Sequence, residues 1–88
     1  MSKLLFNRKD FLAFISYFGF KYLRHESTHY TYHAFINGKH CSVQVDHHFN
    51  EYSGWLLDSM ISQTGIPKKL FWEFRKTGKI LKHINKEL

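Results

Sequence analysis

The chain of 88 residues is long enough for one small domain, and 18% of it is aromatic, which suits a core built from few, large side chains. The single cysteine, Cys41, excludes an internal disulfide and favours a reducing compartment. No stretch is long and apolar enough to cross a bilayer, and no signal-peptide pattern opens the sequence, so we expect a cytoplasmic protein without membrane contact.

The formal net charge is +6 and is unevenly distributed. Residues 68–88 carry seven Lys or Arg and two Glu, whereas residues 1–67 carry six Lys or Arg and five Asp or Glu. A basic domain favours polyanions, nucleic acid above all, because phosphate contacts release bound counterions. The charge points to Lys68, Lys69 and Arg75 as RNA-binding residues, although a solubilising basic tail would have the same composition.

The first predicted element is a helix that begins after Asn7, a suitable N-cap, with Asp10 where acids favour the helix dipole. Its apolar stripe at helical spacing consists of Phe11, Phe14, Ile15 and Phe18. Gly19 is the natural stop, and residues 4–6 are expected to pack against the start of the helix. This helix is predicted to form core and to carry no chemistry.

A first strand is predicted over residues 20–24, where Phe20, Tyr22 and Arg24 alternate with the residues between them. A polar turn at residues 26–28 follows. This pattern places Arg24 on the same side of the strand as Tyr22.

Asn37-Gly38 lies between two alternating runs and predicts a hairpin with a type I′ turn, whose two central residues both need positive φ. A two-residue loop places Ile36 opposite Lys39 and fixes the register. The apolar side of the hairpin then consists of Tyr30, Tyr32, Ala34, Ile36, Cys41, Val43 and Val45. The other side, here called the open face, consists of His29, Thr31, His33, Phe35, His40, Ser42, Gln44 and Asp46.

This register places His29 directly across from Asp46 on the open face. Opposed residues have Cβ atoms about 4.5–5.5 Å apart, so the imidazole and the carboxylate can touch. A carboxylate in that position fixes the tautomer of a histidine and raises its pKa. A surface histidine beside a surface acid would give the same pattern.

Residues 47–52 are polar and unpatterned and predict a loop. Ser53 can cap a second helix that ends at Gly65, and Pro67 suits the start of a third helix over residues 68–75. The apolar residues of these two helices are Trp55, Leu56, Leu57, Met60, Ile61, Leu70, Phe71 and Phe74. Residues 76–88 form a basic amphipathic helix that docks, or a tail that frays.

The order predicts an α+β fold: helix, three strands, helix and a short C-terminal helical extension, with helices on one face of a three-stranded antiparallel sheet. This order and its motifs, from about Asp10 to Phe74, resemble the HicA (YcfA-like) toxins of bacterial and archaeal toxin–antitoxin pairs. Ser27-Thr28-His29 stands where that family carries Gly-Ser-His at the start of its second strand, and the second helix ends in Gly65-Ile66. The sequence departs from the family at Ser27 and Thr28, and at Trp55 and Leu56, where the family has small residues.

The resemblance implies a double-stranded-RNA-binding-like α-β-β-β-α domain over residues 1–75, followed by the extension at 76–88. It implies a metal-independent endoribonuclease, or mRNA interferase, that needs no cofactor and arrests growth. A HicB-like antitoxin would neutralise it. In this interpretation His29 is catalytic, and Asp46 and Thr28 support it.

RNA carries its own nucleophile, so cleavage needs a base for the 2′-hydroxyl, an acid for the leaving oxygen and positive charge beside the phosphate. The charge can come from Lys21, Arg24 or the basic tail, and the second proton carrier from His33, His40, His47 or His48. A metal site is not expected, because histidines four residues apart on a strand are about 13 Å apart. A non-catalytic RNA-binding module of the same fold and a protein-interaction domain are the alternative functions.

Overall fold

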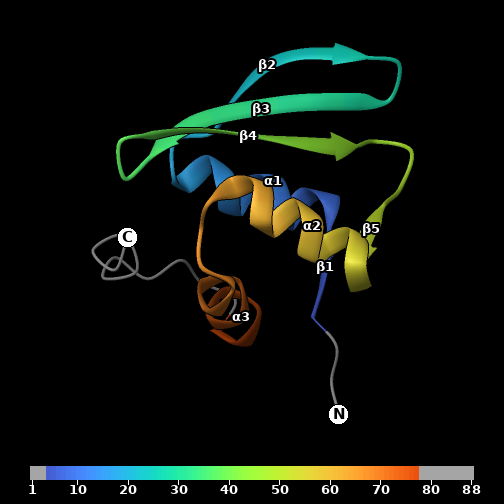
Figure 1. The fold of residues 1–88 in the computed structure, drawn as a ribbon. Helices are drawn as coiled ribbons and strands as arrows, with labels where there is room; N and C mark the ends of the chain where they lie inside the picture. Colours follow the sequence, from blue (N-terminus) through green and yellow to red (C-terminus); the bar gives the residue numbers. More distant parts are fainter. Residues whose placement is uncertain (1–3, 78–88) are drawn as a thin grey trace.

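The computed structural model describes residues 4–77 (Figure 1). Its elements in chain order are β1 (Leu5–Asn7), α1 (Arg8–Tyr17), β2 (Lys21–Glu26), β3 (His29–Ile36), β4 (Lys39–Asp46), β5 (Glu51–Ser53), α2 (Gly54–Thr64) and α3 (Lys68–Thr77). Strands β2, β3 and β4 form a three-stranded antiparallel sheet in that order, and β1 pairs with β5 in a separate two-stranded sheet. Helices α1 and α2 lie on one face of the larger sheet, which confirms the predicted α+β class (Figure 1).

Helix α1 begins and ends where the sequence predicts. The Asn7 side chain accepts a hydrogen bond from the backbone N–H of Asp10 at 2.7 Å, as an N-cap should. The chain leaves the helix at Phe18 and turns at Gly19, which has a φ of +95°. The predicted stripe is buried: Phe11, Phe14, Ile15 and Phe18 are each at most 8% exposed.

The β3–β4 hairpin has the predicted register at every position, from Ile36 opposite Lys39 to His29 opposite Asp46. Asn37 and Gly38 have φ values of +53° and +77°, as the type I′ turn requires. Val43 and Val45 are fully buried under the helices, while Tyr32, Ala34 and Cys41 are partly buried beside them. The open face therefore points away from the helices, as predicted.

Replacing Gly38 with valine should lower the free energy of unfolding by about 1–3 kcal/mol, because a β-branched side chain resists positive φ. Gly38→Asn is the matched control, since asparagine tolerates this conformation, and it should stay close to wild type. Urea unfolding of the three proteins measures the difference. Equal stability of the valine variant and the wild type would contradict the turn.

The first strand differs from its predicted form. Strand β2 runs to Glu26, and its pairing with β3 shifts between Tyr22 and Arg24, so Leu23 forms a β-bulge. Because of the extra residue, side chains after Leu23 change sides of the sheet. Arg24 pairs with Thr31 on the open face, whereas Tyr22 pairs with Tyr32 on the opposite side. The prediction that Arg24 shares a side with Tyr22 was therefore wrong.

Residues 4–6 pack against the start of α1 as expected, since the buried ring of Phe6 meets that of Phe11 edge to face. The expectation of a loop over residues 47–52 was wrong at its end, because β5 begins at Glu51 and pairs with β1, with Phe6 opposite Tyr52. Ser53 occupies the N-cap position of α2, but its side chain makes no capping hydrogen bond.

Helices α2 and α3 meet the core through most of the predicted apolar residues, but Trp55, which was expected on the apolar face of α2, is 82% exposed. Gly65 ends α2 with a φ of +73°, and Leu70 and Phe71 of α3 are at most 1% exposed. Phe71 packs against aromatic rings of β1 and α1. Helix α3 reaches Thr77, and the rest of the predicted extension at 76–88 lies outside the described residues. Between residues 4 and 77, no helix has the length and apolar character needed to cross a membrane.

Candidate functional site

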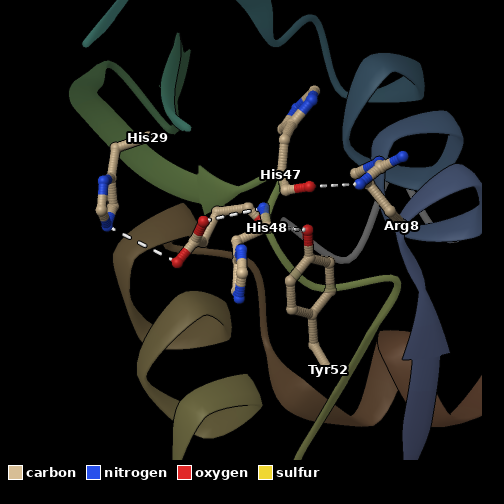
Figure 2. Close-up of polar contacts among 6 residues, drawn as sticks. Arg8, His29, His47, His48 and Tyr52 are labelled. Atoms are coloured by element: carbon tan, nitrogen blue, oxygen red, sulfur yellow. Dashed lines mark hydrogen bonds and ion pairs between the residues drawn. The ribbon is translucent and has the colours of Figure 1, made fainter. Parts of the chain in front are cut away.

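The first residue of β3 and the last residue of β4 form an imidazole–carboxylate pair on the open face (Figure 2). His29 Nε2 lies 3.6 Å from Asp46 Oδ2. The His29 side chain is 56% exposed, whereas that of Asp46 is 22% exposed. A ligand on this face therefore meets the imidazole, with the carboxylate behind it.

The carboxylate is held in place by the chain around it. Asp46 Oδ1 accepts a hydrogen bond from the backbone N–H of His48 at 2.9 Å. That bond, a hydrogen bond from the Thr28 side chain and the nearby imidazole of His29 lower the pKa of Asp46. Tyr52 also donates its hydroxyl to the backbone oxygen of Asp46 at 2.8 Å (Figure 2). Asp46 is thus ionised and is held beside His29 by hydrogen bonds, one of them from Thr28.

The turn before His29 has an unusual backbone. Ser27 has a φ of +56°, in the left-handed region that favours glycine. Ser27 thus adopts a conformation that glycine would adopt without strain.

A hollow of about 350 Å³ lies beside His29 on the open face. Its lining consists of Arg24, His25, Glu26, His29, Thr31 and Gln44. The bulge at Leu23 brings Arg24 and Glu26 here, because it pairs them with Thr31 and His29. The hollow therefore combines one guanidinium, two imidazoles and one carboxylate around Thr31, a residue that is only 9% exposed.

The predicted RNA-binding residues fall into two groups. Arg24 lines the hollow, and Lys21 pairs with His33 farther along the open face. Lys68, Lys69 and Arg75 belong to α3, which lies on the far side of α1 and α2 from the sheet (Figure 1). Lys68 there forms an ion pair with Asp58 at 2.7 Å. The structure does not bring these three residues to His29, because the apolar side of α3 packs against β1 and α1.

Of the four histidines considered as second proton carriers, His48 is the one that lies next to the His29–Asp46 pair, on the Asp46 side (Figure 2). His33 Nδ1 and His40 Nε2 share a hydrogen bond of 3.1 Å, and His33 is four residues from His29 along β3, about 13 Å. His48 offers Asp46 its backbone N–H, and His47 stacks on the other side of the sheet. His25 and Glu26 line the hollow instead, and the bulge hid both from sequence reasoning.

An aromatic stack on the helix-covered side was also missed. Tyr30 lies between His25 and His47, with ring centroids 4.5 Å and 3.8 Å away and nearly parallel planes. The Tyr22 hydroxyl and His25 Nδ1 share a further hydrogen bond of 2.6 Å. Tyr30 was expected in the core, but it is only half-buried. The sequence could not place His47 in the stack, because its segment has no periodicity.

His47 is confined by its surroundings. Its Nε2 is buried and has no hydrogen-bond partner among the described residues. Arg8 donates from Nη1 to the backbone oxygen of His47 at 2.8 Å and to that of Phe49 at 3.2 Å (Figure 2). Burial lowers the pKa of His47, the charge of Arg8 lowers it further, and Asp46 opposes the shift.

We expect acid to destabilise the protein through His47. Below its usual pKa near 6.5, the unfolded chain takes up a proton that the native His47 resists, so unfolding is favoured as pH falls toward the lowered native pKa. Thermal unfolding between pH 7.5 and 5 should show a falling midpoint. His47→Phe keeps a ring against Tyr30 and should flatten that slope, whereas His48→Phe, at an exposed position, should leave it unchanged. Identical slopes for the two variants would contradict this role of His47.

Among the described residues, no group of three or more histidine, cysteine or acidic side chains is arranged to hold a metal ion. Comparison of the chain with protein-family models, with curated proteins and with solved structures finds no match. The fold is that of a small α+β domain. Because these comparisons give no match, the function is inferred from the residues around His29.

Proposed function

We propose that the protein is the toxin of a type II toxin–antitoxin pair, an endoribonuclease of the HicA type that cleaves mRNA with His29 and without a metal. One observation carries the proposal: an exposed imidazole with an anchored carboxylate behind it and a guanidinium in the same hollow. These groups supply two of the three needs of RNA cleavage, a proton acceptor and positive charge at the phosphate.

The chemistry proceeds without a protein nucleophile. Because Asp46 faces Nε2 of His29, it favours the tautomer with the proton on that nitrogen and leaves Nδ1 to act as the base. Nδ1 takes the proton of the 2′-hydroxyl, the 2′-oxygen bonds to phosphorus, and the bond to the 5′-oxygen breaks. Arg24 stabilises the charge on the phosphate, and the leaving oxygen takes its proton from His25 or water. The products are a 2′,3′-cyclic phosphate and a 5′-hydroxyl.

The element order supports the fold part of the proposal. Helix α1, the strands β2, β3 and β4, and helix α2 follow in the order of the double-stranded-RNA-binding-like domain, with β1 and β5 added beside it. The partner in this proposal is an acidic HicB-like antitoxin that covers the open face in the cytoplasm and excludes RNA by occupying it. The basic chain would speed its association. A purified complex that still cleaves RNA would contradict occlusion.

The test is cleavage by the purified wild-type protein in excess chelator. We expect mRNA to be cut to fragments with 2′,3′-cyclic phosphate ends, and the same RNA with methylated 2′-oxygens to remain intact, because it lacks the nucleophile. Activity that chelator abolishes would replace the histidine mechanism with a metal. A folded protein that binds RNA and cuts none of it would be the non-catalytic RNA-binding module.

A further inference from the structure

Phe35 is an exposed aromatic residue that neither the core nor the His29 hollow explains. It belongs to the open face of β3 and is 71% exposed, the most exposed phenylalanine of the described residues, whereas most of the others build the core. Its partner across the hairpin is His40, whose ring lies 5.3 Å away at a tilt of 59°. Strand β2 begins at Lys21, opposite His33, so no β2 residue stands opposite Phe35. The residue is therefore largely open to solvent on the open face.

The charges around Phe35 differ from those around His29. The open-face neighbours of Phe35 are His40 and His33, with Lys21 beyond them on β2. The open-face carboxylates, Glu26 and Asp46, belong to the opposite end of the sheet, at His29. Single-stranded nucleic acid is bound by aromatic rings with a cation nearby, because bases stack on the ring and phosphates meet the cation, which here is Lys21.

We propose that Phe35, with His40 at its side, is a stacking subsite for one unpaired base of an RNA strand that runs along β3 to His29. This inference rests on the proposed function and gives it a substrate class, single-stranded RNA. Phe35 and His29 are six residues apart on one strand, about 20 Å. That span fits the roughly 4–16 nucleotides that single-strand platforms cover. A base inside a duplex is stacked on both faces and offers none to Phe35.

Binding should be measured with a probe that cannot be cleaved, so that failure of this inference and failure of the proposed function are distinguishable. A fluorescent 12-nucleotide strand with every 2′-oxygen methylated serves, because stacking does not use the 2′-hydroxyl. Phe35→Ala should weaken binding roughly 5- to 150-fold, the range for loss of one base–aromatic stack. The dependence of binding on salt should stay unchanged, because no charge is removed.

Two variants control the measurement. Trp55→Ala removes an aromatic side chain that is 82% exposed on α2, and it should change binding less than twofold. Phe35→Trp retains a stacking surface and should bind at least as tightly as wild type. Probes with one base removed at successive positions identify the stacked base: its removal should weaken binding to wild type and have no further effect on Phe35→Ala.

Equal affinities of Phe35→Ala and Trp55→Ala would overturn the subsite. So would a Phe35→Ala variant that binds the strand as wild type does but no longer binds a partner protein, which would assign the ring to a protein interface. A probe annealed into a duplex should lose the difference between wild type and Phe35→Ala, and persistence of that difference would exclude base stacking. Normal Phe35-dependent binding by a protein that cuts no RNA would leave the subsite in place and reject catalysis.

Discussion

Replacing His29 with alanine should reduce RNA cleavage by at least about 100-fold, the effect typical of losing a general acid or base. The His29 side chain is 56% exposed and contributes no core volume, so the free energy of unfolding should change by no more than about 0.5 kcal/mol. RNA affinity should largely survive, because it comes mainly from lysine and arginine contacts to phosphate. The measurement is cleavage of mRNA in chelator, with binding and unfolding recorded on the same preparations.

Asp46→Asn is the companion variant. Its side chain keeps the shape and an oxygen that can accept from the backbone N–H of His48, but it loses the charge behind the imidazole. Its cleavage should therefore fall less than that of His29→Ala. Equal cleavage by wild type and His29→Ala would remove His29 from the mechanism, whatever Asp46→Asn does.

Replacing Phe71 with alanine should destabilise the protein by about 3–5 kcal/mol, the usual cost of removing a buried phenylalanine. Phe71 is fully buried, and its ring lies 4.6 Å from that of Phe14, 5.6 Å from that of Phe6 and 5.9 Å from that of Phe11. Small domains are stable by about 5–15 kcal/mol, so this loss is a large share of the total. Urea unfolding of the variant beside wild type measures it.

The next residue of α3 provides the control. Trp72 is as large but 40% exposed, and Trp72→Ala should cost clearly less than Phe71→Ala. If Phe71→Ala unfolds like wild type, α3 does not dock on β1 and α1.

Local chemistry made the centre of the site predictable. Asn37-Gly38 determines a turn type, the turn determines the register of β3 and β4, and the register places His29 opposite Asp46. The turn and the two strands it joins are consecutive in the chain, so this register can be predicted from the sequence alone.

The parts that sequence reasoning missed depend on contacts between distant segments. The bulge at Leu23 is a property of how β2 pairs with β3, and alternation within β2 alone hides it. Strands of three residues, such as β1 and β5, show no periodicity, and the pairing of Phe6 with Tyr52 joins segments far apart in the chain. The bulge is what places Arg24 and Glu26 in the hollow, and the sequence pattern alone did not predict it.

The bulge in β2 also bears on how the protein behaves at high concentration. Strand β2 has one neighbour in the sheet, so its other side presents backbone donors and acceptors to any extended chain, including another molecule of the same kind. Edge strands of this type seed aggregates when they are straight and regularly spaced. The extra residue at Leu23 bends the strand and breaks that spacing. The irregularity that turns Arg24 toward the hollow thus also makes this edge of the sheet a poorer template for self-association.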